Sequence, residues 1–340
     1  MKGVALLLIL ILIPSANAAW EQYQNDIFNT GKTDGVGNFN KFSANITDFE
    51  NQSNFQPLVS DIDNDDKNEI IIFSNDSLKI LDNKLNEINK TSIGVIQGQP
   101  AIFNIDDDLF KEIIFISNHS LTPYFFAYEY SNFTFKQEFN FSIGNGAIGS
   151  GVKCALIDGT KACIFMDNGQ YIHIVNLSSK TKQSYNTSAF KDTQEKIPAI
   201  GDIDNDGNLE AVFWFDADSD INYGLLVFDL VNRSLDGNFN NNGIVDDIAP
   251  FNVVRPNFDL KDHPVLVDLN NDNKLEVAAS MFYDDGMTGE MFTDWFTQLF
   301  VYGHNGSLLF RKCEERSSSF LGIMSRIFRP IIILLPTFSS

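Results

Sequence analysis

Residues 201–210 read GDIDNDGNLE, with an aspartate at every second position and then a glycine and a glutamate. The segment that contains this stretch begins at Pro198, and related segments begin at Pro57 (PLVSDIDNDDKNEIIIF), Pro100 (PAIFNIDDDLFKEIIFI) and Pro264 (PVLVDLNNDNKLEVAAS). A fifth copy, VKCALIDGTKACIFM from Val152, lacks the acidic middle. The copies start about 40 to 70 residues apart, a period typical of propellers and arrays.

Each copy predicts a group of strands. An apolar run precedes the acidic loop and an apolar, β-branched or aromatic run follows it, and runs of this length between turn residues indicate strands. Third strands are expected at Leu78, Tyr124, Tyr171, Gly224 and Gln298, and a fourth at Ser307. Four antiparallel strands make one propeller blade. We therefore expect an all-β propeller of five recognisable repeats plus an N-terminal closing strand or partial blade, five to seven blades in all.

The repeated unit, an apolar strand followed by D-x-D-x-D-G-x-x-E and a second apolar strand, resembles the FG-GAP/VCBS repeats of integrin α-subunit propellers and their prokaryotic secreted relatives. The resemblance covers residues 57–310, and residues 20–31 resemble the leading segment of related propellers. It implies calcium held in the loop between the first two strands of a blade. It also implies adhesion or recognition of protein or glycan on another face.

The acidic loops offer the hard oxygen ligands that calcium prefers. In the best copy, aspartates alternate, Gly207 permits the backbone reversal and Glu210 closes the loop. Counting from Asp202, the twelfth residue is Phe213 and not an acid, which excludes an EF-hand. The expected metal residues, up to four calcium sites, are Asp202, Asp204, Asp206, Asn208 and Glu210; Asp61, Asp63, Asp65, Lys67 and Glu69; Asp268, Asn270, Asp272, Lys274 and Glu276; and Asn104, Asp106, Asp108, Phe110 and Glu112.

The four acidic copies differ in how well they fit a calcium site, and the residue at the turn decides the order. Asp66, Asn273 and Leu109 replace the glycine, and the loop with Leu109 fits a calcium site least well. Magnesium demands a stricter octahedron, and no His/Cys set indicates zinc. Carboxylates packed this closely repel one another unless a cation or water screens them, so calcium is expected to stabilise the fold.

The fifth copy predicts that a disulfide, instead of calcium, stabilises its first hairpin. Asp158-Gly159 favours a two-residue hairpin turn, and pairing outward from it places Cys154 opposite Cys163. In that register the cysteines form a non-hydrogen-bonded pair, where the strands are closest. A disulfide is expected there, with two reduced core cysteines as the alternative, and Cys313 is left over.

Export is expected from the N-terminus. The first 18 residues have the pattern of a cleaved signal peptide rather than a membrane anchor. They begin with a positive charge at Lys2, continue with an apolar run over residues 4–13 and end with Ala16-Asn17-Ala18. Asn-x-Ser/Thr sequons agree with export, although the Asn-rich composition is an alternative source of them. These sequons lie at Asn45, Asn51, Asn75, Asn89, Asn118, Asn132, Asn140, Asn176, Asn186, Asn232 and Asn305.

The remaining features limit the function. The formal charge of −21 argues against nucleic acid as a partner. The four histidines share no spacing with a nucleophile, so no catalytic residue is assigned. Residues 19–310 are expected to form the propeller, and the basic, apolar segment 311–340 to be an atypical tail that is disordered, packs on the rim or lies on a membrane surface. We expect a secreted or cell-surface, calcium-binding adhesion or recognition module. The alternatives are a secreted polysaccharide lyase or hydrolase and a structural surface component.

Overall fold

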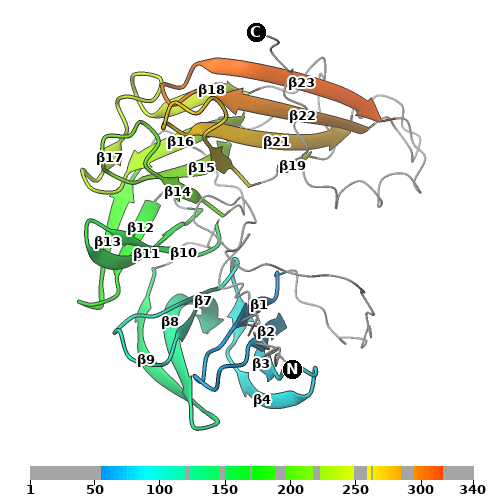
Figure 1. Ribbon diagram of the computed structural model, residues 1–340, viewed down its shortest axis with the longest axis vertical. Helices are drawn as coiled ribbons and strands as arrows, with labels where there is room; N and C mark the ends of the chain where they lie inside the picture. Colours follow the sequence, from blue (N-terminus) through cyan, green and yellow to red (C-terminus); the bar gives the residue numbers. More distant parts are fainter. Residues whose placement is uncertain are drawn as a thin grey trace, which may run out of the picture.

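The computed structural model describes residues 55–316, apart from residues 75, 120–121, 145–149, 169–170, 188–196, 217–222, 249–258, 262 and 285–294 (Figure 1). The expected signal peptide, the N-terminal closing strand, the sequons at Asn45, Asn51 and Asn75, and residues 317–340 lie outside this part of the chain. No helix in the described part is long and apolar enough to cross a membrane.

The described residues form five antiparallel sheets. The first contains β1 (Leu58–Ser60), β2 (Glu69–Ser74), β3 (Ser77–Leu81) and β4 (Glu87–Ser92). The second contains β5 (Val95–Ile96), β6 (Ala101–Phe103), β7 (Glu112–His119), β8 (Thr122–Ser131) and β9 (Thr134–Ser142). The third contains β10 (Lys153–Ile157), β11 (Thr160–Met166), β12 (Tyr171–Asn176) and β13 (Thr181–Asn186).

The last two sheets have five strands each, as the second sheet does. The fourth contains β14 (Ala199–Gly201), β15 (Glu210–Asp216), β16 (Tyr223–Asp229), β17 (Ser234–Leu235) and β18 (Ile244–Ile248). The fifth contains β19 (Asp259–Lys261), β20 (Val265–Val267), β21 (Glu276–Asp284), β22 (Trp295–Tyr302) and β23 (Leu308–Arg316). Strand β23 continues past Phe310, so the first residues of the segment expected to be a tail belong to the last sheet.

The sheets follow one another along an arc, with the first strands of each sheet on the inner side and the last on the outer side (Figure 1). Consecutive strands are neighbours in the manner of a meander, except that β5 and β6 both pair with β7, β19 and β20 both pair with β21, and β18 pairs with β16. This is an all-β propeller, and the fold expected from the repeats is confirmed.

The hydrophobic core lies between the sheets and not inside any one of them. Each of four buried clusters combines side chains from two successive sheets. In the fourth sheet, Val212 and Trp214 pack toward the fifth, while Phe213 and Phe215 pack toward the third. Because the middle sheets are buried on both faces, inner strands such as β11 and β15 are almost continuously apolar instead of alternating.

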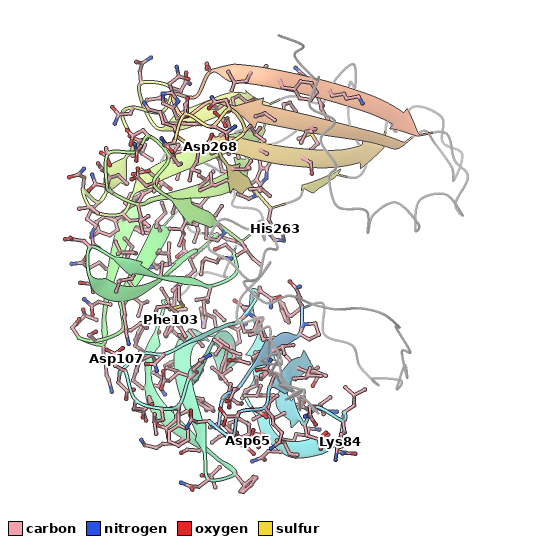
Figure 2. All side chains as sticks on the ribbon, viewed as in Figure 1. Asp65, Lys84, Phe103, Asp107, His263 and Asp268 are labelled. Atoms are coloured by element: carbon pink, nitrogen blue, oxygen red, sulfur yellow. A yellow bond between two sulfur atoms is a disulfide. The ribbon has the colours of Figure 1, made fainter. Side chains whose placement is uncertain are left out.

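Successive sheets also meet at the residue that precedes the first strand of each repeat. The backbone N–H of Gln56 donates to Gln99 Oε1 at 2.8 Å, and Gln99 Nε2 returns a bond to the Gln56 carbonyl. At the other end of the arc, the N–H of Ile197 donates to His263 Nδ1 at 2.8 Å (Figure 2). Gly151 lies between these pairs, where an added Cβ would be 2.6 Å from Ile197 Cγ1. Only glycine fits this contact without displacing a neighbour.

Candidate metal centres

Four of the five sheets contain the same hairpin, in which an acidic loop joins two strands that follow each other along the chain. The residue before the loop pairs with its closing glutamate in each: Ser60 with Glu69, Phe103 with Glu112, Gly201 with Glu210 and Val267 with Glu276. The hairpins join β1 to β2, β6 to β7, β14 to β15 and β20 to β21. The acidic loops therefore occupy equivalent places, as the repeat register predicts.

The closing glutamate is buried in every loop and bonds the backbone of the second loop residue. One carboxylate oxygen accepts an N–H bond, at 3.1 Å from Ile62 to Glu69, 2.6 Å from Ile105 to Glu112, 2.8 Å from Ile203 to Glu210 and 2.7 Å from Leu269 to Glu276. This bond ties the start of the loop to its end. Sequence reasoning assigned these glutamates only as ligands and missed their role in shaping the loop.

The first aspartate shapes the loop as well. Asp202 accepts from the N–H groups of Asp206 and Gly207 at 3.0 and 2.9 Å, and Asp61 accepts from the two equivalent residues. In the second hairpin, Asn104 Oδ1 accepts from the Asp107 N–H at 2.7 Å. A short acceptor side chain at this position therefore folds the loop over itself.

The fifth and seventh positions are linked in the same way. The fifth carboxylate accepts the N–H of the seventh residue, at 2.9 Å in Asp65–Lys67, 2.7 Å in Asp108–Phe110, 2.8 Å in Asp206–Asn208 and 2.9 Å in Asp272–Lys274. Asp65 also forms an ion pair with Lys67 Nζ at 2.7 Å, in which both side chains are exposed.

Two left-handed residues bend the loops. The fourth residue has positive φ in all four, Asn64, Asp107, Asn205 and Asn271, and the sixth does so in Asp66, Gly207 and Asn273. Asparagine and aspartate tolerate this region better than other residues with a Cβ. Leu109 does not adopt it, so loop 104–112 departs from the others at the turn, as its sequence suggested. The left-handed fourth position was not anticipated, although an Asn or Asp recurs there.

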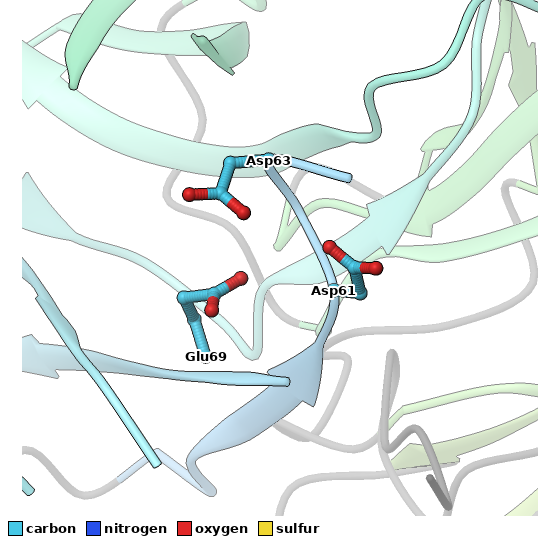
Figure 3. A group of neighbouring side chains, drawn as sticks. All are labelled: Asp61, Asp63 and Glu69. Atoms are coloured by element: carbon cyan, nitrogen blue, oxygen red, sulfur yellow. The ribbon is translucent and has the colours of Figure 1, made fainter. Parts of the chain in front are cut away.

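Three loops bring carboxylates together. Ligand oxygens lie within 4.8 Å of one another in Asp61, Asp63 and Glu69 (Figure 3), in Asp106, Asp108 and Glu112, and in Asp202, Asp204 and Asp206. One buried carboxylate oxygen in each loop has no hydrogen-bond partner among the described residues: Asp63 Oδ1, Glu112 Oε1 and Asp204 Oδ1. A cation would satisfy such oxygens, so these residues fit a hard divalent ion.

The electrostatics agree with the geometry. Burial raises the pKa of Glu69 and Glu112 to about 7 and that of Glu210 to about 8, although a backbone hydrogen bond opposes the shift in each. Neighbouring aspartates raise these pKa values further. Burial and two flanking aspartates also raise the pKa of Asp63. The loops hold negative charge at a cost that a bound cation would remove.

The fourth loop differs at its third position. Asn270 Nδ2 donates to Asp272 Oδ2 and to Glu276 Oε1, both at 3.1 Å. The amide nitrogen thus bridges two carboxylates that a cation would otherwise bridge. Sequence reasoning counted Asn270 as a ligand oxygen and did not anticipate this arrangement.

Loop 104–112 receives a cation from the next sheet. Lys161 of β11 places Nζ 2.5 Å from Asp107 Oδ1 and 3.3 Å from Asn104 Oδ1. The Oδ1 atom of Asn104 is therefore already engaged by Lys161 Nζ and by the Asp107 N–H.

The third sheet has no acidic loop. Its β10–β11 hairpin turns at Asp158 and Gly159, which have φ of 45° and 70°, and Cys154 pairs with Cys163 in the expected register. The two residues are joined by a disulfide with a Cα–Cα distance of 4.0 Å, and both are fully buried against the second sheet.

The same sheet contains a chain of polar groups that sequence spacing did not predict. His173 Nε2 is 3.0 Å from Asp167 Oδ2, and His173 Nδ1 is 2.9 Å from the hydroxyl of Ser184. His173 is buried and its ring packs 4.9 Å from that of Phe165. These contacts provide hydrogen-bond partners for both ring nitrogens of a buried imidazole.

Comparisons with known proteins do not assign a family. No protein-family model matches this sequence, and no curated protein matches it. BBS1N in complex with ARL6DN is 11% identical, with 78% of this chain and 83% of that chain covered and a TM-score of 0.46. The WD40 domain of SCAP from fission yeast is 12% identical (74% and 61% covered, TM-score 0.42).

A third similar structure is the rhamnogalacturonan lyase YesW, with 13% identity and a TM-score of 0.47. The alignment covers 75% of this chain but 46% of the lyase, so this chain spans less than half of that enzyme. At these TM-scores the likenesses carry no argument about function.

Proposed function

We propose that this protein is an exported propeller that calcium stabilises at three blade hairpins and that recognises an extracellular protein or glycan. The observation that carries the calcium proposal is the unpaired buried oxygen in each carboxylate loop, on Asp63, Glu112 and Asp204. Loops 61–69, 104–112 and 202–210 are the three sites. The proposal leaves out loop 268–276, where Asn270 already bridges the carboxylates.

Export is supported by three features. The N-terminal sequence has the pattern of a signal peptide. Five of the sequon asparagines are exposed in the structure: Asn132, Asn140, Asn186, Asn232 and Asn305. The Cys154–Cys163 disulfide suits an oxidising compartment. A secreted or cell-surface location with millimolar calcium would keep weak extracellular sites occupied.

The recognition role rests on the resemblance of the repeats to FG-GAP/VCBS propellers. In this reading the carboxylates are structural, because the same side chains hold the hairpin backbone together. The ligand would therefore bind on a surface other than the calcium loops.

Calcium dependence is tested by thermal unfolding of the full chain in EGTA and in millimolar calcium. Each site with calcium at a hundred times its Kd contributes about 2.7 kcal/mol, so the melting temperature should rise clearly with calcium. Isothermal titration should count three sites. Superimposable melting curves would refute the calcium proposal.

Recognition is tested on glycan and extracellular-protein arrays with the calcium-loaded chain. A saturable ligand supports the proposed role, and binding should be lost in EGTA only as far as the fold is lost. Turnover on a polysaccharide panel without any saturable partner would instead favour the enzyme alternative.

A further inference from the structure

A segment outside the repeat pattern is firmly built into the fourth sheet beside loop 202–210. The Asp236 N–H donates to the Val227 carbonyl at 3.0 Å, and the Val227 N–H donates to the Gly243 carbonyl at 2.8 Å. Phe239 is fully buried in the core between the fourth and fifth sheets. Residues 236–243 are therefore an element anchored in the fold.

Asp236 is the carboxylate of this segment that the fold leaves incompletely paired. The residue is 6% exposed, and its Oδ1 accepts from the Asn238 N–H at 2.9 Å. Its other oxygen, Oδ2, is buried and has no hydrogen-bond partner among the described residues. An unpaired buried carboxylate oxygen is costly unless a cation neutralises it.

Asn238 links this carboxylate to the acidic loop. While its backbone N–H bonds Asp236, its side-chain Nδ2 donates to Asp204 Oδ2 at 2.7 Å. Asp204 Oδ1 is also buried without a partner. The two carboxylates thus lie on either side of one asparagine, and each has one unpaired oxygen.

A nearby acid shows what a purely structural carboxylate looks like in this sheet. Asp229 is also buried, but its Oδ1 accepts from the N–H groups of Val231 and Asn232 and its Oδ2 accepts from the Asn232 side chain. Both of its oxygens are engaged, whereas Asp236 and Asp204 each keep one oxygen free of hydrogen bonds.

We propose that Asp236 supplies an oxygen ligand to the calcium ion held by loop 202–210, so that this site takes carboxylates from two separate segments. The inference deepens the proposed function and rests on calcium binding at that loop. Burial raises the pKa of Asp236, and the charges of Asp204, Asp229 and Asp206 raise it further, which agrees with a position close to the acidic loop.

The added ligand would connect two sheets. The Asn240 N–H donates to the Asn305 carbonyl in the β22–β23 turn at 2.9 Å, and Gly306 leaves room for Asn240 there. Calcium bound by Asp204 and Asp236 would fix residues 236–243 against the fourth sheet and, through Asn240, against the fifth. The site at 202–210 would then be the tightest of the three, because affinity rises with the number of charged ligands.

The test compares Asp236→Asn with Asp229→Asn in the full chain. Because Oδ1 of residue 236 is held by the Asn238 N–H, an asparagine would place its NH2 group where Oδ2 now lies, facing any bound cation. Asp229→Asn removes a charge from the same region but no unpaired oxygen. Isothermal titration with calcium should show one site weakened at least about tenfold in Asp236→Asn and less than about threefold in Asp229→Asn.

A second measurement separates ligation from a structural role. In EGTA, Asp236→Asn should melt at or above the wild-type temperature because it removes a buried, unpaired charge. In calcium it should melt below the wild type. Unchanged affinity at every site in a folded Asp236→Asn protein would overturn the inference, as would a drop in melting temperature of the same size with and without calcium.

The site itself is identified with Asp204→Asn. If that variant loses one calcium site and Asp236→Asn loses none and weakens none, the ligand assignment fails while calcium binding at loop 202–210 stands. If the wild-type chain binds no calcium, both proposals fail.

Discussion

Loops 202–210 and 268–276 have nearly the same backbone and different chemistry. Both turn through left-handed fourth and sixth residues, and both bond a buried closing glutamate to the second residue. They differ at the third position, where Asp204 keeps an unpaired buried oxygen and Asn270 donates to two carboxylates.

The difference indicates that the hairpin and the metal site are separable. The backbone of the loop is specified by the acceptor at the first position, the left-handed turns and the closing glutamate, which both loops possess. Under the proposed calcium binding, a loop needs a cation when its third side chain is a carboxylate and not when it is an amide that donates to the other acids. One residue could therefore convert a metal-dependent hairpin into a self-sufficient one.

The largest expected effect comes from removing the closing glutamates. Glu210→Ala and Glu276→Ala each leave a loop N–H without its partner, which costs about 1–3 kcal/mol. Glu210→Ala should lose about 2.7 kcal/mol more in saturating calcium, because a loop that Glu210 no longer ties through the Ile203 N–H would not hold Asp202, Asp204 and Asp206 around the ion. Denaturant unfolding with and without calcium measures both quantities.

The comparison of Glu210→Ala with Glu276→Ala depends only on how much calcium-dependent stability each variant loses. In EGTA both variants lose the shared backbone hydrogen bond, and Glu276→Ala also loses the bond from Asn270 Nδ2, so Glu276→Ala should be the more destabilised of the two. A Glu276→Ala protein that loses as much calcium stabilisation as Glu210→Ala would show that loop 268–276 also binds the ion.

A smaller effect is expected from exchanging the third residues. Asn270→Asp replaces the bridging amide with a carboxylate, so calcium titration should count one additional site, with up to about 2.7 kcal/mol of calcium-dependent stability. Without calcium this variant should be less stable than the wild type, because two hydrogen bonds become repulsive contacts.

The reciprocal change, Asp204→Asn, serves as the matched control. It should remove one calcium site and reduce the sensitivity of the melting temperature to EGTA. An unchanged site count in both variants would mean that the third position does not decide metal binding.

Much of the fold was predictable because the repeat fixes it. The apolar runs on both sides of each acidic loop predicted β1 and β2, and Asp158-Gly159 predicted the register that pairs Cys154 with Cys163. A fourth strand was expected in each blade, but β4 (EINKTS) and β13 (TKQSYN) could not be located in the sequence, because they are largely exposed and carry little apolar signal.

The candidate sites were predictable as loops but not as individual contacts. Alternating Asp and Asn residues predict a loop that could bind a metal ion, but the sequence alone does not say whether Asn270 points its side-chain oxygen or its nitrogen at the neighbouring carboxylates. Asp236 was missed because its neighbourhood depends on how Phe239 anchors residues 236–243 in the core. Contacts between segments of different repeats follow from packing, which no local spacing reveals.

The last effect concerns pH in the cation-free protein, and it is small for each single pH unit. Folding raises the pKa of Glu210 to about 8 and those of Glu69 and Glu112 to about 7, above the ordinary glutamate value of 4.5. Between pH 4.5 and these values the folded state binds more protons than the unfolded state. Stability in EGTA should therefore fall as pH rises through this window, by at most about 1.4 kcal/mol per pH unit for each group.

Loop 268–276 should respond in the opposite direction and at lower pH. The N–H of Lys274 lowers the pKa of Asp272, so its contribution is present above the ordinary aspartate value and is lost on acidification below it. Glu210→Gln should flatten the neutral-pH slope, and saturating calcium should abolish it because the bound ion holds the carboxylates ionised. A wild-type stability in EGTA that rises from pH 5 to pH 8 would contradict the assignment, since the buried glutamates would then be stabilised as carboxylates without any cation.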